Sequence, residues 1–188
     1  MTQSGVETEV KIRIADLSGV LSKLHGLGYA TSVERLFEAN TLYDKPDQEL
    51  RARGVLLRLR QAGDKKVITW KGVAQAGPHK SRPEIETSIG SLEAAAKVLE
   101  QLGLFPQFRY EKYRTELTSA KSDDGTVTAD ETPIGNFIEL EGPADWIDST
   151  AREMGFGAAD YILDSYGKLY LTDCERRGVE PTNMVFAS

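Results

Sequence analysis

The chain has 188 residues, of which 40% are hydrophobic and 28% are charged, as in ordinary globular proteins that bury a core. Its formal net charge of −6 argues against a nucleic-acid surface built on bulk positive charge, and no apolar stretch approaches the roughly 20 residues of a membrane span. The N-terminus lacks the pattern of a signal peptide, and the single cysteine excludes an internal disulfide. We expect a cytoplasmic enzyme or binding protein with neither a nucleic acid polymer nor a membrane as partner.

Alternation of apolar and polar residues predicts strands along most of the chain. In residues 6–14, valine and isoleucine face one way while glutamate, lysine and arginine face the other. Later strands are expected at residues 29–43, 55–61, 66–71, 82–89, 108–120, 126–131 and 136–141. Turn signals at residues 62–65 and 123–125 indicate hairpins, so the strands are expected to pair mostly antiparallel.

Helices are expected between groups of strands. They are predicted at residues 16–28, at 91–102, from Pro143 onward and at 163–177. Capping residues, an apolar stripe in the first of them and a proline tolerated in a first turn support these assignments. The sequence contains neither an internal repeat nor a linker, so we expect one α+β domain over residues 1–178. Residues 179–188 are expected to form a flexible tail.

The charged alternation of the first strand recurs on nearly every later strand. Arg58 and Arg60, for example, share one face of their strand, while Leu57 and Leu59 share the other. Helices need an apolar surface on which to pack. The economical arrangement therefore places the apolar faces under the helices and curls the charged faces inward, as a barrel with a polar lumen.

Two sets of opposite charge would line such a lumen. The basic set is Lys11, Arg58, Arg60, Lys71, Lys112 and Arg114. The acidic set is Glu7, Glu9, Asp130, Glu139 and Glu141. Guanidinium and ammonium groups bind phosphate oxygens, and carboxylates suit Mg²⁺ or Mn²⁺, which bridge carboxylates and phosphates. The residues alone are compatible with a metal-assisted polyphosphate site and, about equally, with surface ion pairs on an open sheet.

Several short motifs follow one another in a defined order. They are Glu7-Thr8-Glu9-Val10-Lys11, Leu57-Arg58-Leu59-Arg60, Thr69-Trp70-Lys71-Gly72, Arg82-Pro83-Glu84-Ile85-Glu86, Glu111-Lys112-Tyr113-Arg114, Asp130, the run from Gly135 to Glu141, and Ser165-Tyr166. In type and order, these motifs resemble the CYTH superfamily, which includes class IV adenylate cyclases, thiamine triphosphatases and triphosphate tunnel metalloenzymes. The resemblance covers residues 7 to about 170.

The resemblance implies an eight-stranded antiparallel β-barrel, a triphosphate tunnel with helices packed on the outside. The basic set would bind phosphate oxygens, and the acidic set would hold one or two divalent ions, Mg²⁺ or Mn²⁺. Glu9, Lys11 and Lys71 would take part in catalysis. A further group, Arg82, Glu84 and Glu86, is expected mainly to orient the basic residues.

The same resemblance leaves two reactions open. Attack by water on the γ-phosphate gives a triphosphatase, whereas attack by a ribose hydroxyl on the α-phosphate gives cyclic AMP and pyrophosphate. Residues 40–46 look closer to triphosphatase-like members, because Asn40 stands where the cyclase group tends to carry an aspartate, although residues 105–141 resemble both groups about equally. We therefore predict a metal-dependent phosphohydrolase that acts on inorganic, organic or nucleoside triphosphates. The alternatives are a class IV adenylate cyclase, a non-catalytic polyphosphate-binding module and an interaction protein with a solvated charged sheet.

Other residues are expected to carry no chemistry. Residues 72–80 should form a plain surface loop, with a mobile lid as the alternative, and His79 should be solvated or capping. Cys174 should be a helix residue without a role. The substrate beyond its triphosphate group stays open. Members of the resembled family are often dimers, so the resemblance also leaves room for a homodimer.

Overall fold

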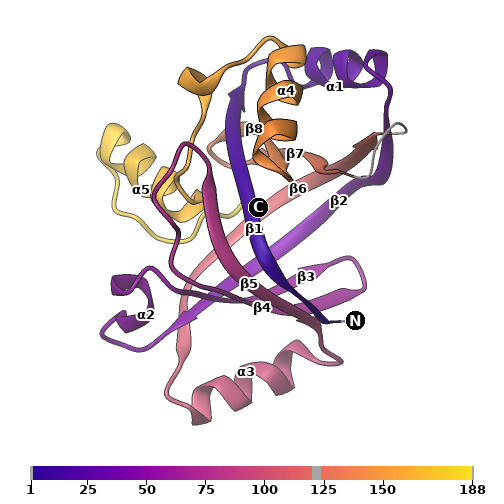
Figure 1. Cartoon of the computed structure of the whole chain (residues 1–188). Helices are drawn as coiled ribbons and strands as arrows, with labels where there is room; N and C mark the ends of the chain where they lie inside the picture. The colour runs from indigo at the N-terminus through magenta and orange to yellow at the C-terminus, as the bar shows by residue number, and fades with distance from the viewer. Residues whose placement is uncertain (1, 120–123, 188) are drawn as a thin grey trace.

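The protein folds as a closed antiparallel barrel in a computed structural model that describes residues 2–119 and 124–187 (Figure 1). Its strands are β1 (Thr2–Ile14), β2 (Tyr29–Asp44), β3 (Leu56–Ala62), β4 (Lys65–Lys71), β5 (Lys80–Ser88), β6 (Phe105–Ser119), β7 (Thr126–Thr132) and β8 (Gly135–Glu141). Around the barrel they follow the order β1-β5-β4-β3-β2-β6-β7-β8, and each neighbouring pair is antiparallel. The predicted eight-stranded antiparallel barrel is thus confirmed.

Helices cover the outside of the barrel, as predicted. They are α1 (Leu17–Gly26), α2 (Glu49–Ala52), α3 (Leu92–Gln101), α4 (Ala144–Met154) and α5 (Tyr166–Arg177), with a short 3-10 turn at Ala158–Asp160. In Figure 1, α1 and α4 lie together at one end of the molecule and α3 lies at the other. In the part of the chain that the structure describes, every helix is too short or too polar to cross a membrane.

The outward apolar faces of the strands form the core with these helices. Val10 and Ile12 of β1 are almost completely buried in a cluster with Leu24 of α1 and Ile147 of α4. A separate cluster joins the outer face of β2 and β3 to α3 through Leu99. Since the apolar faces point outward to the helices, the charged faces point into the barrel.

Most helices and strands begin and end close to the predicted residues. The side chain of Ser91 accepts a hydrogen bond from the amide of Ala94 and caps α3, as expected. The terminal helix begins at Tyr166 rather than at residue 163, because Ser165 caps it by accepting from the amide of Lys168. The strand predicted from residue 82 begins at Lys80.

The C-terminal segment differs from the expected flexible tail. Strand β7 pairs with β6 only from Tyr113 onward, which leaves the backbone of Arg109 and Glu111 free on that edge. Met184 fills this place: its amide donates to the carbonyl of Arg109 at 3.0 Å, and its carbonyl accepts from the amide of Glu111 at 2.9 Å. The Met184 side chain is completely buried against Tyr110 and Tyr170 in one cluster. Backbone pairing and apolar burial therefore hold the segment in place.

Candidate active site in the barrel lumen

Side chains from all eight strands enclose a cavity of about 390 Å³ inside the barrel, called here the lumen cavity. Its wall contains the complete predicted basic set, Lys11, Arg58, Arg60, Lys71, Lys112 and Arg114. It also contains Glu7, Glu9, Glu139 and Glu141 of the acidic set, and Arg82, Glu84 and Glu86. Residues 165–167, at the start of α5, complete the wall. The barrel thus brings together every predicted site residue except Asp130.

One part of the cavity wall is rich in carboxylates, each placed by the register of β1 with β5 and of β4 with β5. Lys71 lies opposite Glu84 in the sheet, and its ammonium lies 2.6 Å from both oxygens of Glu7 and 3.0 Å from Glu84. Lys80 lies opposite Glu9, and its ammonium lies 2.6 Å from Glu9 Oε1. These carboxylates are therefore held by lysines from other strands, Glu9 by one on the adjacent strand β5 and Glu7 by one on β4.

The charge of this carboxylate region is unevenly balanced. Burial opposes ionisation of Glu9, but Lys11 and Lys80 outweigh it and hold the pKa of the Glu9 carboxyl well below its usual range. Glu141 lies opposite Glu9 on β8, and within the described residues it has no ion-pair partner. Burial and the negative charge of Glu7 raise the pKa of Glu141 to about 7. The region around Glu141 thus carries negative charge that an added cation would relieve.

Cations dominate the part of the wall built by β3 and β6. The guanidinium of Arg58 donates to the hydroxyl of Thr69 at 3.1 Å and to that of Tyr110 at 3.3 Å. Burial alone would raise the pKa of Tyr110, but Arg58, Arg60 and Lys112 lower it to about 8. A phenol that ionises this readily reports a strongly positive local potential, which suits a polyanion.

Asp130 lies behind the cavity wall rather than in it. Its carboxylate is fully buried, accepts from Lys112 at 2.9 Å and from Arg114 at 2.6 and 2.7 Å, and accepts from the hydroxyl of Tyr166 at 2.7 Å. Arg114 also pairs with Glu139. The resemblance implies Asp130 as a metal ligand, and that stays a prediction; its contacts in this structure orient two residues of the basic set. These four residues, Asp130, Lys112, Arg114 and Tyr166, are called the Asp130 cluster below.

The structure adds residues that the sequence analysis had not selected. Glu38 is buried on β2, with Oε2 3.6 Å from both Arg60 and Lys112. Burial disfavours its charge, but Lys112 and Arg60 lower the pKa of Glu38 to about 2. Tyr110 and Lys80, also not selected from the sequence, line the lumen cavity. Alternation on residues 38–42 could have pointed to Glu38, whereas Lys80 lay in a segment assigned to a loop.

The loop before β5 is anchored beside the site. His79, expected to be solvated or capping, keeps only 9% of its side chain exposed, and its Nε2 lies 2.8 Å from Oδ1 of Asp148 on α4. The hydroxyl of Tyr161 donates to the same oxygen at 2.9 Å. These contacts tie the loop to the helical layer, immediately before Lys80.

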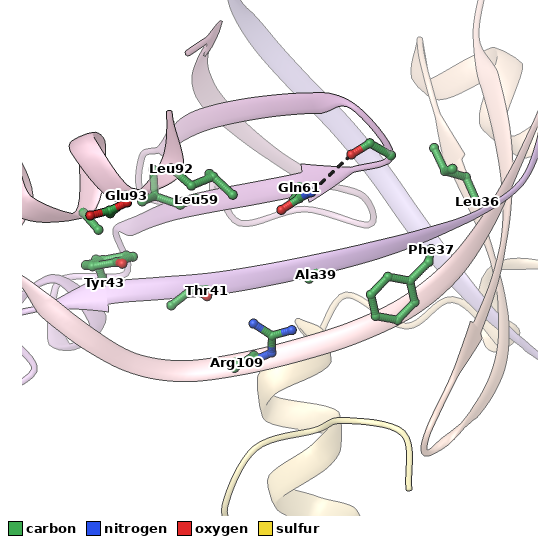
Figure 2. Close-up of a pocket in the computed structure, with 12 residues that line it drawn as sticks. Leu36, Phe37, Ala39, Thr41, Tyr43, Leu59, Gln61, Leu92, Glu93 and Arg109 are labelled. Carbon is green, nitrogen blue, oxygen red and sulfur yellow. Dashed lines mark hydrogen bonds between the residues drawn. The ribbon is translucent and has the colours of Figure 1, made fainter. Parts of the chain in front are cut away.

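A second pocket, of about 510 Å³, lies on the outer side of β2 and β3 next to α3 (Figure 2). Because side chains alternate, Ala39 and Thr41 of β2 face this pocket, whereas Asn40 faces into the barrel. Arg109 is the one basic residue among the described side chains that line it. With so little positive charge, this outer pocket does not suit a polyanion, and the lumen cavity is the candidate site.

The sequence model of the CYTH domain matches residues 5–171, which is most of the chain. This chain belongs to the CYTH family. A relative from Methanocaldococcus jannaschii, named as a candidate adenylate cyclase, is 29% identical over 140 residues, covering 72% of this CYTH protein and 76% of the relative.

Solved structures with the same fold come from several organisms. A candidate adenylate cyclase from Vibrio parahaemolyticus aligns with a TM-score of 0.76 at 23% identity, covering 89% of the CYTH chain and 98% of its own. A Hippeastrum protein, described as a candidate adenylyl cyclase with a dominant triphosphatase activity, aligns with a TM-score of 0.62 at 14% identity, covering 94% and 97%. At these identities the likeness establishes the fold alone.

The lumen of this CYTH protein has the donor chemistry for a divalent ion, although Glu7 and Glu9 are paired with lysines. Among the described residues, no three carboxylate, histidine or cysteine side chains are already gathered in a ready metal site. Glu7, Glu9 and Glu141 nevertheless face the same part of the cavity, and the raised pKa of Glu141 marks uncompensated negative charge there. Carboxylate oxygens are the ligands that Mg²⁺ and Mn²⁺ prefer. The residues therefore fit such an ion.

Proposed function

We propose that this CYTH protein is a divalent-metal-dependent hydrolase of the triphosphate group, acting inside the lumen cavity. The observation that carries the proposal is the composition of that cavity, where eight basic side chains and seven carboxylates line one space inside the barrel. A cavity lined by cations and carboxylates suits an anion that binds together with a metal ion. A simple anion-binding module would gain nothing from the carboxylates, which repel its ligand.

Phosphoryl transfer depends mainly on positioning and electrostatic stabilisation. Arg58, Arg60, Lys112 and Arg114 would hold phosphate oxygens and stabilise the charge that develops on the leaving group. The Asp130 cluster keeps two of these side chains in place before substrate binds. Preorganised cations of this kind lower the barrier without reorganising during the reaction.

The carboxylates would hold the metal ion on the other side of the phosphate chain. Glu7, Glu9 and Glu141 are the residues expected to bind it, and a bound Mg²⁺ or Mn²⁺ supplies charge neutralisation and a water of lowered pKa. Lys11 lies 3.1 Å from Glu9 and 3.0 Å from Glu139, so it orients both carboxylates while facing the cavity. Lys71 similarly fixes Glu7.

Cyclisation of ATP is the second candidate, and a specific cavity favours it. A neighbouring space of about 650 Å³, called here the rim cavity, shares Leu42, Leu56 and Lys80 with the lumen cavity. Its wall includes Phe108 and Leu163, an apolar surface that suits a base or another organic group. The names of the Methanocaldococcus and Vibrio proteins point the same way. Hydrolysis is preferred because it needs only the charged lumen, and the Hippeastrum protein is described with dominant triphosphatase activity.

Product analysis distinguishes the two reactions. Purified protein with Mg²⁺ or Mn²⁺ is incubated with tripolyphosphate or ATP, and orthophosphate, pyrophosphate and cyclic AMP are separated. We expect orthophosphate that is lost in Glu9→Gln and after chelation of the metal. Glu93→Gln on the exposed face of α3 serves as the matched control and should keep full activity. Cyclic AMP with equimolar pyrophosphate would instead establish the cyclase. If neither substrate gives a metal-dependent product, both the hydrolase and the cyclase are contradicted.

A further inference from the structure

Lys80 lies between two cavities, as Arg82 does. Lys80 is the first residue of β5, and its side chain lines both the lumen cavity and the rim cavity. Its ammonium lies 2.6 Å from Oε1 of Glu9, one of the carboxylates expected to bind metal. A phosphate chain that extends from the lumen cavity toward the rim cavity would pass this ammonium.

Three cations lie around one oxygen of the Glu9 carboxylate. Its Oε1 lies 3.1 Å from Lys11, 2.6 Å from Lys80 and 4.0 Å from Arg82. Glu141, directly opposite Glu9 on β8, has no ion-pair partner within the described residues. Three cations thus lie within 4.0 Å of one oxygen of Glu9, whereas the neighbouring Glu141 has no ion-pair partner in the described part of the chain.

Of the three cations, Lys80 is held by the fewest contacts. Lys11 also pairs with Glu139 at 3.0 Å, and Arg82 also pairs with Glu7 at 3.5 Å. In the described part of the chain, Glu9 is the one ion-pair partner of Lys80. Lysine has a flexible four-carbon stem and three rotatable donors, so its ammonium can be redirected without moving the strand.

We propose that Lys80 is a further substrate-binding residue whose availability is controlled by the metal ion. Without metal, its ammonium is the counter-ion of Glu9. When a divalent ion takes the Glu9 carboxylate, repulsion between the two cations releases Lys80, which then binds a phosphate oxygen at the junction of the two cavities. The nature of the anion rests on the proposed function, whereas the exchange at Glu9 does not.

The exchange predicts opposite effects on two affinities. Removing the Lys80 charge removes a competitor for the Glu9 carboxylate, so metal should bind more tightly. The same change removes a phosphate ligand, so the anion should bind more weakly once metal is present. An ammonium that only supports the fold would affect neither affinity, or would weaken both.

Lys80→Met tests the inference by calorimetry. Mn²⁺ alone should bind about tenfold more tightly to the variant, and a non-hydrolysable methylene-bridged triphosphate, at saturating Mn²⁺, about tenfold more weakly. Lys80→Arg keeps the charge and should remain close to the wild type in the anion titration. Lys97→Met, an exposed lysine on α3 that pairs with Glu93, is the matched control and should change neither affinity.

Thermal melting verifies that each variant is folded, and Lys80→Gln replaces Lys80→Met if the latter does not fold. Unchanged or weaker Mn²⁺ binding in the charge-removing variant, Lys80→Met or its replacement Lys80→Gln, would overturn the exchange, and unchanged anion binding in that variant would overturn the substrate contact. Absence of Mn²⁺ binding in the wild type would overturn the inference as well. Because neither titration requires turnover, a chain that binds metal but hydrolyses no triphosphate would refute the proposed function without deciding the exchange.

Discussion

Replacing Asp130 by asparagine tests whether this residue holds the cavity wall together or binds metal. The substitution removes the negative charge that faces Lys112 and Arg114, and it puts an amide where four donor contacts now end. Removing one partner of a buried ion pair typically costs about 3–5 kcal/mol, because the remaining charge stays buried. For a chain of this size each kcal/mol lowers the melting temperature by about 2–4 °C. We expect Asp130→Asn to melt about 6–20 °C below the wild type.

The assay combines calorimetric melting with Mn²⁺ titration at a temperature where the variant is folded. Mn²⁺ affinity should be retained, because Asp130 does not line the lumen cavity. The adjacent residue offers a matched control: Glu131 forms an exposed pair with Arg35, so Glu131→Gln should cost less than about 1 kcal/mol. A wild-type melting temperature together with lost Mn²⁺ binding would refute this reasoning and identify Asp130 as a metal ligand.

Further predictions concern other parts of the molecule. Absorbance at 295 nm should show a tyrosine that titrates at about pH 8 and that is absent in Tyr110→Phe. Tripolyphosphate should raise the pKa of this tyrosine by neutralising the surrounding cations. If the titration near pH 8 is not observed, the positive potential around Tyr110 is contradicted. Met184→Ala should lower the free energy of unfolding in urea by about 2–5 kcal/mol, because it leaves a cavity where a buried side chain was. Met184→Leu conserves the volume and should lower it by less than about 1.5 kcal/mol. Equal losses in the two variants would argue against a packed C-terminal segment. His79→Ala should speed hydrogen exchange in residues 72–79 by removing the contact with Asp148, with little change in global stability; unaltered exchange would show that this contact does not hold the loop.

The period of two residues along a strand predicted which side chains share a face, whereas the closed eight-stranded barrel was implied by the resemblance to the CYTH superfamily. Glu9 and Lys11 share a face on β1, and Val10 and Ile12 share the other, so one short segment already indicates a charged interior and an apolar exterior. The same alternation on other strands predicted most of the cavity wall. Side-chain direction is a local property, and local properties are what a single sequence encodes most directly.

Alternation does not give the depth of a side chain or its partners. Asp130 points inward as predicted, and Arg114 lies opposite it on the neighbouring strand β6, but Tyr166 reaches it from helix α5, which the folded barrel brings there. The pairing of Lys80 with Glu9 likewise depends on the register of β1 with β5, which joins residues 71 positions apart. Such contacts follow from closure and register, and a pattern along one strand does not contain them.

The most direct test of the account is calorimetric titration of tripolyphosphate into Arg60→Met, with Arg35→Met in parallel. Arg60 lines the lumen cavity and donates to Asn40 at 2.9 Å, whereas Arg35 lies on the outer surface over the ring of Tyr113. A hydrogen bond to a charged group contributes about 1.5–3 kcal/mol, so Arg60→Met should weaken binding by about 10- to 100-fold while Arg35→Met leaves it unchanged. Equal affinities for all three proteins, or equal losses in both variants, would contradict binding of the triphosphate inside the barrel.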